Sequence, residues 1–188
     1  MYVILEVCIA VTLSNIMREV SRARSTPNIL RRKERIYGKL NPHYIAGFID
    51  GEGSFSVSIG KHKTLKRGLE VRIEFSIEVR ADDRNIIKRI RQVIGCGNIY
   101  NIPYRKQGWY PHVKYKIGSR KDLVNYLFPL LDKYPLQAKK KQSYEIFKKV
   151  VLLCENKEHL SDKGFEKILK LRNQIRKMGK KAVNRRNR

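Results

Sequence analysis

Two carboxylates lie close together between glycines in the stretch YIAGFIDGEGSF, which runs from Tyr44 to Phe55. Asp50 and Glu52 follow a short apolar run that we expect to be helical, so both acids fall near the helix C-terminus, where the macrodipole disfavours negative charge. In such a place Asp50 can bond nearby backbone amides of the turn, and Glu52 can pair with a lysine. Alternatively the acids hold divalent metal, and paired metal sites support phosphodiester hydrolysis.

The charge of the chain indicates a polyanionic partner. Its 188 residues include 42 lysines and arginines against 17 acids, a formal net charge of +25. Neutralising phosphates releases condensed counterions, so nucleic acid is the first candidate. An anionic membrane surface fits poorly, because the charge is spread along the chain instead of lining one amphipathic helix. The three cysteines form no C-x-x-C pair, which favours an intracellular protein without a disulfide framework or zinc ribbon.

The helix that carries the acids has one face with almost no side-chain bulk. Ala46 and Gly47 lie on it, with Gly51 one turn further on, and such a face lets a second helix approach closely. If the partner is the same helix of a second subunit, a two-fold axis brings two Glu52 carboxylates together, and divalent cations neutralise such a pair. In such a dimer we expect an interface that includes Tyr44, Ala46, Gly47, Phe48, Asp50 and Gly51.

Three segments are expected along the chain. Residues 1–13 are apolar but lack a basic n-region, are interrupted by Glu6 and are too short to cross a bilayer as a helix. We predict a basic N-terminal extension over 1–40, for which a solvated tail is a better explanation than DNA contact. A folded domain over 41–179 and a basic tail over 180–188 follow.

Hydrophobic periodicity predicts an α+β domain. Helices are expected at 42–50, with Asn41 as N-cap, and at 84–94, capped by Asp82 or Asp83. Two hairpins are expected from strands 54–60 and 69–79 and from strands 98–105 and 109–117. A capping box at Ser119 and Asp122 begins a helix that ends near 131, and further helices cover about 137–154 and 161–178, the last capped by Ser161. The predicted order is α-β-β-α-β-β-α, followed by more helices.

The sheet is predicted to have an apolar inner face and a polar outer face. The outer face is rich in Ser, Arg, Lys, Glu, His and Tyr, and a basic turn at 61–68 joins the first two strands. A two-stranded ribbon fits the major groove of DNA, where base edges present distinguishable donors and acceptors. We predict DNA contacts from the following residues: Ser56, Ser58, Lys61, His62, Lys63, Lys66, Arg67, Arg72, Glu74, Ser76, Arg80, Tyr100, Lys114, Lys116 and Lys140.

The stretch YIAGFIDGEGSFSVSI resembles the signature of the LAGLIDADG homing endonucleases, from whose named consensus it departs at Tyr44, Phe48, Gly51 and Glu52. The segments IEFSIEVRADDR and YPLQAKKKQ and the order of elements are similar as well, so the resemblance covers roughly 41–178. It implies a curved antiparallel sheet that serves as a DNA-binding saddle. It also implies a site-specific endonuclease for double-stranded DNA, encoded by an intron. The single motif implies a homodimer acting on a near-palindromic site.

Roles for individual residues follow from the same resemblance. Glu52 would be the metal-binding carboxylate for Mg²⁺ or Mn²⁺, with the Gly51 carbonyl as a possible second ligand. Asp50 would be a further catalytic candidate, whose main role is to support the turn and the interface. Lys139 would be the basic residue near the scissile phosphate, with Lys140 or Lys141 as alternatives should the register differ.

Three points stay open at the level of sequence. The glutamine that orders the attacking water in this family has no clear counterpart, because Val79 and Arg80 stand there, and Arg80 is the candidate for that role. An RNA-binding maturase for intron RNA and a catalytically inactive DNA-binding regulator are the alternative functions. The retained Asp50 and Glu52 favour the nuclease, which would act in the cytoplasm, the nucleoid or the organelle that houses the host intron.

Overall fold

A computed structural model describes residues 38–103 and 110–184 of the chain. Most of the predicted N-terminal extension (1–37), the tip of the second hairpin (104–109) and the end of the predicted tail (185–188) lie outside the described residues. The chain divides between Lys39 and Leu40 into two units, and the second, Leu40–Arg188, carries almost all of the described structure. Of the helices within these described ranges, none has the length and apolar character that crossing a bilayer requires.

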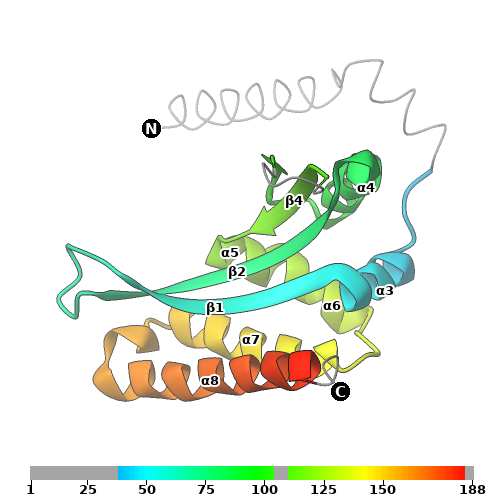
Figure 1. Ribbon diagram of the computed structural model, residues 1–188. Coiled ribbons are helices and arrows are strands. Elements are labelled where there is room, and N and C mark those ends of the chain that lie inside the picture. Colours follow the sequence, from blue (N-terminus) through cyan, green and yellow to red (C-terminus); the bar gives the residue numbers. More distant parts are fainter. Residues whose placement is uncertain (1–37, 104–109, 185–188) are drawn as a thin grey trace, which may run out of the picture. The chain divides into compact units, whose positions relative to one another are not determined.

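A four-stranded antiparallel sheet forms the centre of this unit (Figure 1). Its strands are β1 (Gly53–Lys61), β2 (Leu69–Arg80), β3 (Asn98–Ile102) and β4 (His112–Ile117), and they lie in the order β1-β2-β4-β3. Along β1 and β4 every second residue is more deeply buried, because successive side chains of a strand point to opposite faces. The α+β fold that the sequence predicts is confirmed.

The helix α3 (Pro42–Glu52) begins and ends as its sequence dictates. The Asn41 side chain accepts a hydrogen bond from the His43 amide at 2.9 Å, and proline occupies the first helical position. The helix ends at Gly53, where an added Cβ would lie 2.6 Å from the carbonyl oxygen of Ile49. The helix is two residues longer than predicted (42–50), so both acids of the motif lie in its last turn.

The helix α4 (Arg84–Ile94) ends at Gly95, whose φ of +92° suits glycine. The predicted start is wrong in detail, because the turn η1 (Ala81–Asp83) precedes α4 and the Asp83 side chain makes no capping bond within the described part of the chain. Asp82 pairs instead with Arg80, at 2.7 Å between the Arg80 Nη2 and the Asp82 Oδ2.

The helix predicted from Ser119 to near 131 forms three segments: α5 (Arg120–Asp122), the π-helical turn η2 (Leu123–Leu127) and α6 (Phe128–Lys133). Ser119 is confirmed as the N-cap, since its Oγ accepts a hydrogen bond from the Asp122 amide, which is one of the two bonds of a capping box. Pro129 lacks the N–H that a regular α-helix needs at this point, which favours a wider turn before it.

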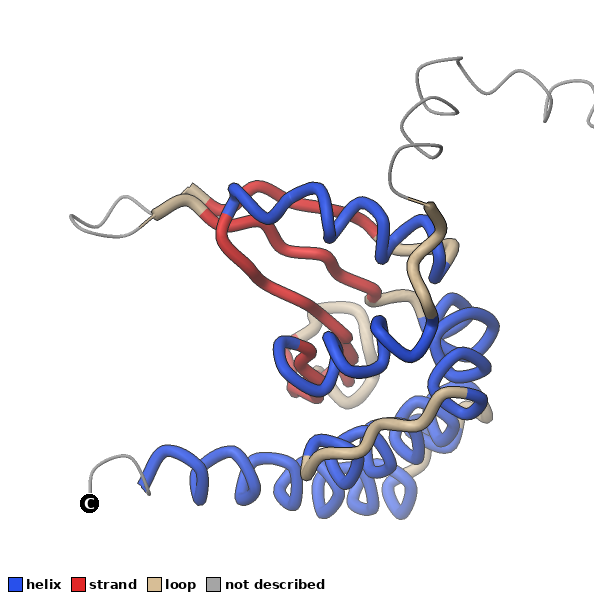
Figure 2. The backbone as a smooth tube through the Cα atoms, turned by 90° about the vertical axis from the view of Figure 1, so that its right-hand side faces the viewer, coloured by secondary structure: helices blue, strands red, loops and turns tan. Residues whose placement is uncertain are grey.

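Two long helices cover the inner side of the sheet. They are α7 (Lys140–Glu155) and α8 (Asp162–Asn184), joined through the turn η3 (Glu158–Leu160), and α8 runs on into the predicted tail. Figures 1 and 2 show α7 and α8 side by side along one side of the strands. The Ser161 Oγ accepts a hydrogen bond from the Gly164 amide at 3.1 Å, as expected for an N-cap.

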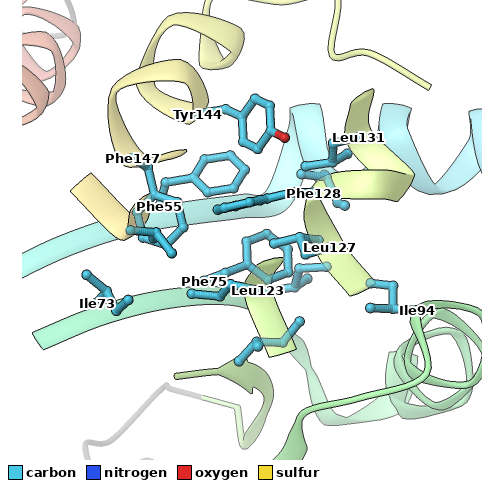
Figure 3. Packing of buried hydrophobic residues seen from close by; sticks show 14 of the residues in the cluster. Phe55, Ile73, Phe75, Ile94, Leu123, Leu127, Phe128, Leu131, Tyr144 and Phe147 are labelled. Carbon is cyan, nitrogen blue, oxygen red and sulfur yellow. The ribbon is translucent and has the colours of Figure 1, made fainter. Parts of the chain in front are cut away.

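Aromatic rings fill the space between sheet and helices. Phe55 of β1 lies 5.3 Å from Phe75 of β2, 5.3 Å from Phe147 and 5.4 Å from Tyr144 of α7, between ring centroids (Figure 3). Each such pair contributes about 0.5–1.5 kcal/mol beyond the burial of its area. This core holds β1, and therefore the last turn of α3 that precedes it, against the start of α7.

Candidate functional site

The carboxylate of Asp50 joins two segments that are far apart in the sequence. Its Oδ2 accepts hydrogen bonds from the backbone amides of Gln137, at 2.7 Å, and Ala138, at 3.1 Å. Both amides belong to the loop that leads into α7. Asp50 therefore bonds backbone amides, which is one of the two roles that the sequence suggests for it. These amides belong to a loop 87 and 88 residues further along the chain, and not to the turn that follows Asp50.

Lys140, the first residue of α7, places its ammonium group at the end of α3. Its Nζ donates hydrogen bonds to the carbonyl oxygens of Ile49, at 3.1 Å, and Gly51, at 2.9 Å. The last carbonyls of a helix have no partner within the helix and carry its negative dipole end, so they attract a cation. Burial lowers the pKa of Lys140, and the charges of Asp50 and Glu52 partly offset this effect.

The structure brings Lys140, and not Lys139, against the motif. Lys139 and Lys141 are exposed, whereas Lys140 is half-buried. Lys140 is thus the first of the two alternatives to Lys139 that the sequence left open, and which lysine acts near the scissile phosphate stays a prediction. Backbone carbonyls of its own chain hold the Lys140 ammonium group here, and its predicted contact with DNA stays a prediction as well.

Oxygen donors at the end of α3 fit a hard divalent cation. Glu52 and Gly51 are both exposed there, and a carboxylate with a backbone carbonyl is the kind of oxygen set that Mg²⁺ accepts together with waters and substrate phosphates. The Gly51 carbonyl already receives a cationic group from Lys140. Within 38–103 and 110–184 no three His, Cys, Asp or Glu side chains gather as a metal site.

A stripe of four residues runs along α3, with Tyr44, Gly47 and Gly51 exposed and Phe48 half-buried at the edge of the core. Tyr44 is 49% exposed, its ring lies 6.1 Å from that of Phe48, and a Cβ added at Gly47 or Gly51 would meet no atom within 4 Å. These four positions share one helical face.

Two residues of the predicted interface lie elsewhere. Ala46 is only 5% exposed and belongs to the hydrophobic core of its own chain. Asp50 turns its carboxylate toward the loop before α7. Ala46 and Asp50 therefore lie off the stripe, because the helix turns these two positions inward, and their part in a dimer interface stays a prediction.

Glu74 and two lysines form a network at the centre of the outer sheet face. The Glu74 Oε1 lies 2.7 Å from the Lys114 Nζ, and its Oε2 lies 2.7 Å from the Lys116 Nζ. Burial acts to raise the pKa of Glu74, but the hydrogen bonds and charges of both lysines outweigh burial and hold that pKa below its ordinary value. We call Lys114, Glu74 and Lys116 the β2–β4 triad.

The prediction that Ser76 is exposed on this face is wrong. Ser76 is 7% exposed, and it lies opposite Lys116 in the pairing of β2 with β4, while Lys114 lies opposite Glu78. To reach Glu74, the side chains of both lysines must extend along the sheet past Ser76. Alternation puts Ser76 on the outer face, and these long stems then cover it.

The tip of the first hairpin keeps most of its predicted basic surface. Lys61, Lys63 and Lys66 are exposed, and His62 is half-buried, with its Nδ1 at 3.2 Å from the Thr64 hydroxyl. Ser56, Ser58, Arg72, Arg80 and Tyr100 are exposed as expected. The Arg80 guanidinium lies 4.3 Å from the ring centroid of Tyr110, and its contact with DNA and its role with water stay predictions.

Arg67 is the exception at this tip. Its guanidinium donates hydrogen bonds to the carbonyl oxygens of His159 and Leu160, pairs with Asp162 and lies 4.5 Å from the ring centroid of Phe165. These partners belong to η3 and the start of α8, which lie at the same end of the molecule as the hairpin tip (Figure 1). Arg67 anchors the tip to the helices in this structure, and its contact with phosphate stays a prediction.

The family of the chain follows from comparison with known proteins. Residues 45–151 match the family described as LAGLIDADG endonuclease. The chain is 33% identical over 135 residues to the "Probable intron-encoded endonuclease 3" of Neurospora crassa, covering 71% of this chain and 24% of that one. It is 31% identical over 110 residues to the "Homing endonuclease I-ApeII" of Aeropyrum pernix, covering 58% and 61%.

Solved structures agree with this assignment. The structure of I-SmaMI bound to an uncleaved DNA target in the presence of calcium ions is 38% identical, with a TM-score of 0.67, covering 74% of this chain and 46% of that one. I-LtrWI bound to target DNA is 31% identical with the same TM-score, covering 73% and 44%. The chain belongs to the LAGLIDADG endonuclease family. It spans about a quarter of the first fungal relative and less than half of each of these two solved chains.

The β2–β4 triad predicts a pH dependence of stability. We expect Glu74→Gln to lower the free energy of unfolding by about 1 kcal/mol at neutral pH, since half-exposed charged hydrogen bonds are partly screened. The pKa of Glu74 is depressed in the folded state, so its contribution is complete above the ordinary value of 4.5 and is lost as the pH falls through the folded value. Urea titrations of both proteins over this range measure the difference.

Glu166→Gln is the matched control for this experiment. It removes the same charge from a helical pair with Lys170, where the Glu166 side chain is 65% exposed, and we expect almost no change in stability from it. A difference between parent and Glu74→Gln that stays constant or grows toward acid pH would contradict the assignment of the triad.

Proposed function

We propose that the chain is a site-specific endonuclease that hydrolyses phosphodiester bonds of double-stranded DNA, with a divalent metal and as a homodimer. The observation that carries the proposal is the junction of α3 with α7, where Asp50 holds the start of α7 and Lys140 caps the last carbonyls of α3 beside Glu52. The names of the relatives support the chemistry, and the solved relatives named above are bound to DNA targets.

Each group at the junction has a task in this proposal. Glu52 and the Gly51 carbonyl hold Mg²⁺ or Mn²⁺, which when bound lowers the pKa of a water ligand and stabilises charge on phosphate oxygens. Lys140 places its positive charge beside the Gly51 carbonyl and Glu52, and it orders the solvent near the scissile phosphate. Asp50 acts as a positioning residue, because its bonds to the Gln137 and Ala138 amides set where Lys140 lies.

A second copy of the chain supplies the other half of the site. The stripe of Tyr44, Gly47, Phe48 and Gly51 allows two α3 helices to approach closely, and the last turn of each then brings its Glu52 to the shared axis. The two solved chains are more than twice as long as the portion that this chain matches, at 46% and 44% coverage. A homodimer would provide a comparable total length and an outer sheet face from each subunit.

The first test is metal-dependent cleavage. Duplexes are selected from a randomised library by binding to the full chain and are then incubated with it in Mg²⁺ or in EDTA. We expect cleavage in Mg²⁺ only. We expect Glu52→Gln to lower the rate by about 10²-fold or more, since an essential metal ligand is lost, while binding in the absence of metal stays close to that of the parent. Equal cleavage by Glu52→Gln would show that the metal assignment is wrong.

The second test separates the neighbouring lysines. We expect Lys140→Met to lower the single-turnover cleavage rate roughly 10²–10⁴-fold, as for loss of a group that assists proton transfer, with little change in the dissociation constant for DNA. Lys139→Met removes the same charge from the exposed position next to it and should cut at nearly the parental rate. A larger loss for Lys139→Met than for Lys140→Met would place the reactive register back at Lys139.

A further inference from the structure

We propose that the β2–β4 triad reads one base pair of the target, selecting A·T or T·A against G·C. The inference deepens the proposed function and rests on it, because it assumes that the outer face of the sheet lies in the major groove. It assigns to Lys114, Glu74 and Lys116 a joint role that no one of them could fill alone.

The three charged ends stand in a fixed order. The Glu74 carboxylate bridges the two ammonium groups, with one oxygen 2.7 Å from the Lys114 Nζ and the other 2.7 Å from the Lys116 Nζ. Because like charges repel and each oxygen takes a different ammonium, the carboxylate lies between the lysines. The surface therefore presents donor, acceptor and donor in sequence, on the two central strands of the sheet.

The ion pairs within the triad leave some of its hydrogen-bond donors and acceptors free to bind the edge of a base pair. An ammonium has three donors and a carboxylate accepts about four hydrogen bonds, and each group spends only part of this capacity on its neighbours. All three side chains are already restricted, with 27%, 25% and 40% of Lys114, Glu74 and Lys116 exposed. Part of the entropy of ordering them is thus lost before DNA binds, which favours specific recognition.

The order of donors and acceptors decides which pair fits. Across the major groove an A·T pair presents the adenine N7 acceptor, the adenine N6 donor and the thymine O4 acceptor. This pattern complements donor, acceptor and donor in either orientation of the pair. A G·C pair presents two acceptors, N7 and O6, and then the cytosine N4 donor. Against G·C, the carboxylate would face an acceptor and one ammonium would face a donor, so charged groups would be left unpaired in the groove.

Glu74 cannot serve as a favourable phosphate contact, and this supports a role for it in recognising a base pair. A carboxylate repels the DNA backbone, and neutralising two lysines lowers the sequence-independent affinity that counterion release provides. A nuclease that relied on charge alone would bind DNA more tightly without Glu74. The carboxylate is therefore best explained by discrimination between base pairs.

The test compares the selected target sequences of the parent and Glu74→Ala in the full chain. We expect one position in each half of the parental consensus to favour A·T or T·A over G·C by roughly tenfold. Glu74→Ala leaves two donors side by side, which suit the guanine N7 and O6, so the preference at this one position should disappear or invert. Glu166→Ala on α8 carries the same charge change away from the sheet and should keep the parental consensus.

Two further measurements keep the test decisive. Lys116→Met retains the apolar stem and removes one donor, and it should weaken the preference at the same position if Glu74→Ala fails to fold. The affinity ratio for two duplexes that differ only at this pair should stay constant between low and high salt, since base contacts release no counterions. A consensus that is unchanged in both triad variants would overturn the inference alone, whereas a parent that selects no consensus would overturn the proposed function with it.

Discussion

The bonds between the last turn of α3 and the start of α7 are the constraint on which the rest of the site depends. The Asp50 carboxylate accepts hydrogen bonds from two backbone amides of the loop before α7. The Lys140 ammonium donates hydrogen bonds to two backbone carbonyls at the end of α3. Asp50 gives the two loop amides acceptors, and Lys140 adds a cation to the carbonyl end of α3. Together with the aromatic core, this exchange holds Lys140 beside the last turn of α3, which carries Glu52.

This junction also explains how acids are tolerated in a chain with a net charge of +25. The end of a helix is a poor place for a carboxylate unless cations offset the dipole. Lys140 supplies one such cation from within the chain, and a metal with its phosphate ligands would supply more. The outer sheet face repeats the arrangement at Glu74, where two lysines surround a single acid. At both sites a carboxylate lies beside lysine ammonium groups, within a chain whose net charge is strongly positive.

Much of the fold follows from local patterns. Alternation located β1 and β2, and Asn41, Gly95, Ser119 and Ser161 end or begin helices as their chemistry predicts. The errors at the ends of α3 and α4 are local and small, whereas those that bear on the site come from long-range contacts. The Gln137 and Ala138 amides carry no side-chain signal, and a run of three lysines does not reveal which one a helix turns inward. Arg67 found partners 92 to 95 residues away, and Ser76 is covered by side chains from another strand, so neither could be placed from strand position alone.

Hydrogen exchange at two backbone amides tests the central claim most directly. The Gln137 and Ala138 side chains are exposed, and both residues precede α7, so only the bonds to Asp50 give their amides a reason to exchange slowly. Measured by NMR on the free chain, both should be protected, and Asp50→Ala should return both to rapid exchange while the amides of β2 stay slow. Rapid exchange of both amides in the parent would contradict the account, because Asp50 would then not bond the loop that leads into α7.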